Sequence, residues 1–165
     1  MRTVIVTGGA SGIGLATCEA LAARDDRIVL ADRDADRARA EASRLAQSGA
    51  VVGASEVDVT DPAAVESLVA DADEGGDLAG LVNAAGVVQL GTIADVSVED
   101  WDRVVDVNLK GTFLTCRAVI SRRSSLGSSP ISSPTSASST TSTRARGPTE
   151  WLFSRSRSRT GARAS

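Results

Sequence analysis

A glycine-rich octet near the N-terminus constrains the fold of this chain more than any other feature. Residues 7–14 read Thr-Gly-Gly-Ala-Ser-Gly-Ile-Gly, directly after the apolar run 3–6 and directly before a stretch rich in Ala, Leu and Cys. This order predicts a buried strand, a tight turn and a helix. Free N–H groups and the positive end of the helix dipole bind anions at such a turn, so the octet predicts a phosphate site. A glycine-rich connector without a ligand is the alternative.

We expect the three spaced glycines of the octet to have different roles. Gly8 permits the tight turn out of the strand, and Gly12 lets a pyrophosphate approach the backbone. Gly14 allows the helix to pack closely on the sheet. Ser11 and Ile13, which flank Gly12, complete the predicted binding loop.

Strands and helices alternate after the octet, up to about residue 120. Strands are expected at 3–7, 27–31, 51–57 and 78–83, and helices at 13–23, 34–48, 61–73 and from Ser97 toward Val119. Asp61 is the expected N-cap of the third helix, with Pro62 at its first position. Repeated strand–helix units imply an α/β fold, a Rossmann-like doubly wound parallel sheet that is incomplete, with about four strands.

Charge and composition divide the chain near residue 120. Residues 1–120 carry 10 Lys or Arg against 20 Asp or Glu, whereas residues 121–165 carry 8 Arg and one acid. The second segment also holds 15 Ser and 6 Thr. We therefore expect a dinucleotide-binding Rossmann half at 1–120 and a low-complexity tail at 121–165, either disordered or produced by a shifted reading frame. Alternatively, the tail is a natural Ser/Arg segment that binds RNA or a partner protein.

Several site classes and locations are not expected from the composition. No apolar run approaches the ~18 residues of a membrane span, and the N-terminus has no signal-peptide pattern, so we expect a cytoplasmic protein without a membrane partner. Cys18 and Cys116 fall in helical patterns and are expected to be buried free thiols. The chain has no His and two Cys, so no metal site is expected.

Polar residues at two strand ends are the next candidates for ligand binding. Asp32 ends the second strand, 18 positions after Gly14, where a carboxylate accepts hydrogen bonds from an adenosine ribose. It favours NAD, because it would repel a 2′-phosphate, although Arg33 could hold that phosphate and NADP stays open. Asp58 and Val59 end the third strand and could border the adenine. Solvated turn carboxylates are the alternative for both acids.

Five motifs in order resemble those of the short-chain dehydrogenase/reductase family. They are the octet, Asp32, Asp58-Val59, the tetrad Asn83-Ala84-Ala85-Gly86 and the stretch Val107-Asn108-Leu109-Lys110-Gly111. The resemblance covers residues 1 to about 120. It implies an oxidoreductase that moves a hydride between NAD(P) and a small alcohol or ketone, in a homo-oligomer that pairs through the long helix near Ser97. Nucleic acid is not among the implied partners.

The resemblance also assigns roles to the later motifs. Asn83, Ala84 and Gly86 steady the central strand beside the cofactor. Asn108 has a supporting catalytic role, because its counterpart holds a water and a helix bend for a proton relay. A polar helix residue satisfied by a neighbouring carbonyl is the alternative for Asn108.

The acid–base residues of the family do not appear in this sequence. The family uses a Ser to position the substrate oxygen, a Tyr to exchange the proton and a Lys four residues later. A phenol needs a nearby cation to act as a base at neutral pH. This chain has no Tyr, and its single Lys is Lys110, which precedes the region of the dyad. We therefore expect a truncated, inactive chain that binds the adenosine half of NAD.

Overall fold

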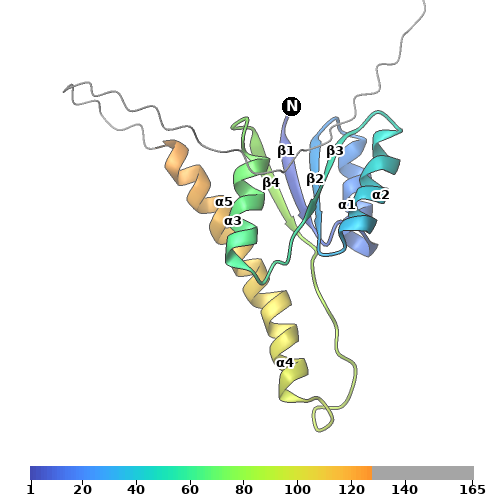
Figure 1. The fold of residues 1–165 in the computed structure, drawn as a ribbon, viewed down its shortest axis with the longest axis vertical. Coiled ribbons are helices and arrows are strands. Elements are labelled where there is room, and N and C mark those ends of the chain that lie inside the picture. The colour runs from blue at the N-terminus through green and yellow to red at the C-terminus, as the bar shows by residue number, and fades with distance from the viewer. Residues whose placement is uncertain (128–165) are drawn as a thin grey trace, which may run out of the picture.

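The computed structural model describes residues 1–127, in which four strands alternate with helices (Figure 1). The strands are β1 (Thr3–Thr7), β2 (Arg27–Asp32), β3 (Val51–Glu56) and β4 (Leu78–Asn83). The helices are α1 (Gly12–Ala22), α2 (Ala35–Ala46), α3 (Pro62–Ala72), α4 (Val98–Val105), the π-helical segment η1 (Asp106–Lys110) and α5 (Gly111–Gly127). The alternation follows the expected order of elements.

The four strands form one parallel sheet in the order β3-β2-β1-β4. Val6 of β1 pairs with Leu30 on one side and with Val82 on the other, so β1 is central. Their carboxyl ends therefore meet at a single edge of the sheet, which is where parallel sheets bind ligands. The predicted Rossmann-like parallel sheet is confirmed. In the described chain, β4 forms an outer edge of that sheet.

Helices cover both faces of the sheet, because alternate strand residues point to opposite sides. Val4 and Val6 pack in a core beneath α1 and α2, whereas Ile5 packs in a second core with α3 and α5 (Figure 1). Cys18 of α1 lies in the first core, and burial raises the pKa of its thiol to about 12. That thiol stays protonated and inert at neutral pH, while Cys116 is only half-buried.

Local capping explains where the helices begin. The Asp61 carboxylate accepts the Ala63 N–H at 2.9 Å, and Pro62 occupies the first helical position, as predicted. The third strand ends one residue earlier than expected, because the Val57 N–H bonds the Asp32 carbonyl after the ladder has ended.

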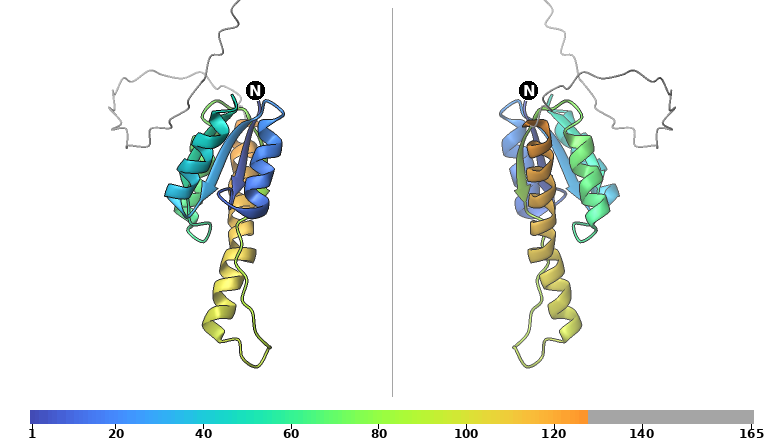
Figure 2. Two further views of the ribbon diagram at one scale, coloured as in Figure 1. Left: turned by 90° about the vertical axis from the view of Figure 1, so that its right-hand side faces the viewer. Right: turned by 90° about the vertical axis from the view of Figure 1, so that its left-hand side faces the viewer.

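The prediction of one continuous helix from Ser97 toward Val119 is wrong in one respect. Five residues, Asp106–Lys110, form a wider π turn between α4 and α5. The three segments still make one rod, and its α4 end projects well beyond the sheet (Figure 2). Helix α5 continues to Gly127, past the expected boundary at 120, whereas the rest of the predicted tail lies outside the described residues.

Two arginines beyond residue 120 attach the end of α5 to the sheet. Arg122 Nε contacts Asp73 Oδ2 at 3.2 Å, and the Asp73 side chain is only 3% exposed. The other carboxylate oxygen of Asp73 accepts the Leu78 N–H at 3.2 Å, and Arg123 donates to the Leu78 carbonyl at 3.1 Å. This part of the chain therefore fixes α5 to the amino end of β4.

We predict that Arg122→Ala destabilises the domain by about 1–3 kcal/mol, because it leaves a buried carboxylate without its cation. Arg117→Ala on the same helix is the matched control. Its ion pair with Glu66 is exposed on both sides, so its loss should cost less than about 1 kcal/mol. Urea unfolding followed by circular dichroism measures both values. Equal costs for the two variants would contradict the structural role of Arg122.

Candidate functional site

The glycine octet forms the turn between β1 and α1 at the carboxyl edge of the sheet. Gly8 has a φ of +64°, and a Cβ there would stand 2.6 Å from the Ala85 backbone nitrogen. A Cβ on Gly14 would collide with the Gly8 carbonyl oxygen. By contrast, Gly12 has a φ of +50° and nothing within 4 Å of its Cβ position. The turn is thus tightly packed behind and open in front.

The N-terminus of α1 faces this open space with its first-turn N–H groups. Ser11 is the N-cap, and within the described residues its side chain makes no capping hydrogen bond. The first turn carries no acid. Because the leading N–H groups of a helix have no intrahelical partner, this end is suited to an anion such as a phosphate.

Asp32 connects the end of β2 to the octet. Its Oδ2 accepts the Ala10 N–H and its Oδ1 accepts the Asp34 N–H, both at 3.1 Å. A carboxylate offers about four acceptor positions, so each oxygen keeps one for a further donor. These two bonds hold the carboxylate at the mouth of the turn. Arg33 and Arg37 line the same space.

Asp58 and Val59 follow β3 at the same edge of the sheet. Val59 is buried at 7% exposure, and Asp58 is exposed. Asp58 Oδ1 accepts the Thr60 N–H at 2.8 Å and the Thr60 hydroxyl at 2.7 Å. These two bonds hold the pKa of the Asp58 carboxyl below its usual value, with a smaller contribution from Arg33. Asp58 is therefore an anchored carboxylate at this position.

The segment after β4 is bound to the end of β1. The Ala84 N–H bonds the Thr7 carbonyl at 3.1 Å, and the Ala85 N–H bonds the Thr7 hydroxyl at 3.3 Å. Asn83 faces the other way, toward α5. Its Oδ1 accepts the hydroxyl of buried Thr115 at 2.7 Å. Asn83 thus holds α5 against the sheet and supports the cleft from behind.

Asn108 lies in the π turn and clamps the segment after β4. Its Oδ1 accepts the Val87 N–H at 2.8 Å, and its Nδ2 donates to the Val87 carbonyl at 2.9 Å. A Cβ on Gly86 would come within 3.3 Å of Asn108 Oδ1, so the contact is close. The amide is satisfied by backbone on both sides. Its supporting role in catalysis stays a prediction.

These segments enclose a cleft of about 940 Å³, near the upper end of the range for ligand pockets. Most of the predicted cofactor residues line it: Gly8, Ser11, Gly12, Ile13, Asp32, Arg33, Asp58, Val59, Ala84 and Gly86. Gly14, Asn83 and Asn108 do not line the cleft and support it from behind. The geometry therefore brings together residues from four separate strand ends.

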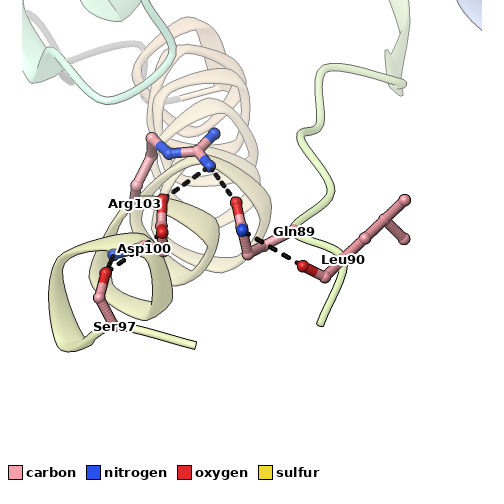
Figure 3. A network of polar contacts seen from close by, with 5 residues as sticks. All are labelled: Gln89, Leu90, Ser97, Asp100 and Arg103. Atoms are coloured by element: carbon pink, nitrogen blue, oxygen red, sulfur yellow. Dashed lines mark hydrogen bonds and ion pairs between the residues drawn. The ribbon is translucent and has the colours of Figure 1, made fainter. Parts of the chain in front are cut away.

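The sequence reasoning missed two contributors to the site. A Cβ on Gly111 would stand 2.7 Å from Val59 Cγ2, so this glycine lets α5 approach the loop after β3. A glycine inside a helical pattern was the available signal. Arg103 of α4 lines the cleft and donates to Gln89 Oε1 at 2.9 Å and to Asp100 Oδ1 at 3.2 Å (Figure 3). It ties the segment after β4 to the rod.

Two further searches cover residues 1–127. No helix in this range is both long enough and apolar enough to cross a membrane. No group of three or more His, Cys, Asp or Glu in the same range could hold a metal ion.

Comparisons with known proteins identify relatives over the described domain. The family model for short chain dehydrogenases matches residues 2–129. A D-threitol dehydrogenase of Mycolicibacterium smegmatis is 39% identical over 131 residues, which are 79% of this chain and 50% of the relative. A 2-(S)-hydroxypropyl-CoM dehydrogenase of Xanthobacter autotrophicus is 36% identical over 120 residues, 72% of this chain and 47% of the relative.

Solved structures give the same picture. A citronellol catabolism dehydrogenase of Pseudomonas aeruginosa has a TM-score of 0.68 at 35% identity, covering 73% of this chain and 50% of that one. A short chain dehydrogenase from Mycobacterium avium has a TM-score of 0.72 at 34% identity, covering 76% and 47%. The chain spans about half the length of the relatives it matches.

We predict that Gly8→Ala destabilises the domain more than Gly49→Ala does. Both glycines have positive φ, so each substitution costs about 1–2 kcal/mol of backbone strain. Only the Gly8 variant also forces a Cβ into the Ala85 backbone, which adds about 1–3 kcal/mol. Urea midpoints of the two variants measure the difference. Matching midpoints would show that the loop after β4 does not press on the turn.

Proposed function

The chain belongs to the short-chain dehydrogenase family, and from this premise we propose that it binds NAD in the cleft without transferring a hydride itself. The carrying observation is a single one: the open space in front of Gly12, at an uncapped helix N-terminus, shares a cleft with the Asp32 carboxylate. An anion site and a hydroxyl acceptor side by side match the two polar parts of a dinucleotide's adenosine half.

The pyrophosphate position follows from the turn. A side chain at Gly12 would project into the space that the phosphate needs, and the φ of +50° excludes most other residues there. Ser11 and Ile13 flank this point and line the cleft. The helix dipole and the free N–H groups of α1 would hold the negative charge.

The ribose and adenine positions follow from the strand ends. Asp32 keeps acceptor positions for the two ribose hydroxyls while Ala10 and Asp34 hold it in place. Val59 offers an apolar wall for the adenine, and Asp58 offers an acceptor beside it. A 2′-phosphate would meet the Asp32 carboxylate, so we propose NAD rather than NADP. Arg33 and Arg37 lie close enough to the cleft to soften that preference.

The reaction of the family is a hydride transfer between the nicotinamide and an alcohol or ketone, which is the chemistry that the bound cofactor supplies. The matched relatives carry names that end in dehydrogenase and begin with alcohols such as D-threitol. We propose a small alcohol or ketone as the substrate class of the whole protein. This chain lacks the phenol that exchanges the proton, because it has no Tyr.

Lys110 does not replace the missing base. Its ammonium pairs with Asp106 at 3.5 Å on the same rod and does not line the cleft. A lysine needs burial or a neighbouring cation to become a base near neutral pH, and Lys110 is 48% exposed beside a carboxylate. We therefore propose cofactor binding without turnover for this chain. We further propose a cytoplasmic location, which is consistent with the two free cysteines, Cys18 and Cys116.

We predict that the chain binds NADH and that Asp32→Asn weakens this binding about 10- to 100-fold, the usual value of charge-assisted hydrogen bonds to a ligand. Asp36→Asn makes the same charge change on a side chain that is 98% exposed, so its affinity should match the parent chain. Fluorescence titration with NADH measures the three affinities. If Asp32→Asn binds as well as Asp36→Asn, the ribose assignment is wrong.

We also predict that the chain with NAD and a panel of small secondary alcohols, D-threitol included, forms NADH no faster than a sample without protein. The reason is the missing phenol. The full-length D-threitol dehydrogenase relative, assayed in parallel, controls for the conditions. Sustained NADH formation by the purified chain would refute the inactivity proposal while leaving the binding proposal intact.

A further inference from the structure

Three large apolar side chains stand exposed along the rod of α4, η1 and α5. Trp101, Leu109 and Phe113 are 57%, 68% and 57% exposed. They follow one another at spacings of eight and four residues. Four residues bring side chains to one helix face. Eight residues of a regular α-helix overshoot two turns by about 80°, and the wider π turn between Trp101 and Leu109 reduces that offset. These three residues therefore form one apolar stripe.

The apolar stripe lies on the side of the rod that faces away from the sheet. Leu114 and Thr115, on the opposite side, are 5% and 1% exposed and pack toward α3 and β4. Nothing in residues 1–127 covers the stripe, as the exposed fractions show. A contiguous row of large apolar groups on a surface marks a place where another segment binds.

The chain after Gly127 contains one segment suited to this surface. Residues 128–165 are dominated by Ser, Thr and Arg, with one run of three consecutive large apolar residues, Trp151-Leu152-Phe153. We propose that this trio docks on the apolar stripe of the same chain. Two rings and one branched side chain would then pack against two rings and one branched side chain.

The length of the connecting chain suits this contact. Trp151 lies 24 positions after Gly127, where α5 ends. A flexible segment of that length has an average span of about 24–29 Å. Along the rod, Phe113 and Leu109 lie about 21 and 27 Å from Gly127 at 1.5 Å per residue. Because the average span matches the distance, the effective concentration of the trio at the stripe is near its maximum.

Charge also favours this docking. Arginines stand on both sides of the trio, at Arg144, Arg146, Arg155, Arg157 and Arg159. The rod carries the exposed acids Asp102 and Asp106 beside the stripe, and residues 1–120 have twice as many acids as bases. Opposite charges steer the tail toward this face of the domain.

The two tryptophans of the chain allow a direct test in the full chain. Trp151→Phe keeps the trio aromatic and leaves Trp101 as the sole tryptophan. Adding Leu152→Asp and Phe153→Asp should release the stripe, so quenching of Trp101 by iodide should rise about twofold or more as the ring loses its contacts. The matched control adds Ala162→Asp and Ala164→Asp to Trp151→Phe, which makes the same charge change away from the trio. It should leave the quenching unchanged.

A reciprocal pair of variants tests the other side of the contact. Trp101→Phe leaves Trp151 as the reporter, and adding Leu109→Asp and Phe113→Asp should expose Trp151 to iodide to a similar extent. Equal quenching with and without the aspartates, in either pair, would overturn the proposal. Quenching of Trp101 that falls as the protein concentration rises would also overturn it, because a second copy would then be covering the stripe.

Discussion

The close contact between the Gly8 turn and the segment after β4 determines the geometry of the whole carboxyl edge. The Gly8 backbone stands so near to Ala85 that no side chain fits between them, and Thr7 bonds both Ala84 and Ala85. This contact sets the depth of the cleft and the position of the α1 N-terminus. Asp32 depends on it as well, because its carboxylate accepts the N–H of Ala10 in the same turn.

The π turn has a comparable effect at the far wall of the cleft. Its wider turn places Asn108 opposite Val87, where the amide makes two hydrogen bonds to backbone. It also presents Gly111 to Val59, so α5 reaches the sheet without a gap. A regular α-helix would turn Asn108 to another side and leave Val87 unpaired. The helix therefore gives up regularity at the one place where it must meet two loops.

Sequence patterns predicted the sheet well because its information is local. The bounds of β1 and β4 follow from apolar runs bordered by turn residues, and the start of α3 follows from Asp61 and Pro62. The same holds for the octet, whose glycines mark their own conformations. What the sequence did not reveal depends on contacts between distant segments. The π turn, the pairing of Asn83 with Thr115, and the anchoring of α5 by Asp73 are of this kind.

Such a division of local and distant contacts also separates binding from catalysis in this domain. Each feature that suits a dinucleotide lies at the end of β1, β2, β3 or β4, and the turns that carry these features are held by bonds within residues 1–127. Cofactor recognition therefore needs only this half of a longer fold. Proton transfer needs a phenol and a cation at a fixed distance, which no strand end of this half provides. A chain of this composition can keep the ligand of its family while lacking the family's chemistry.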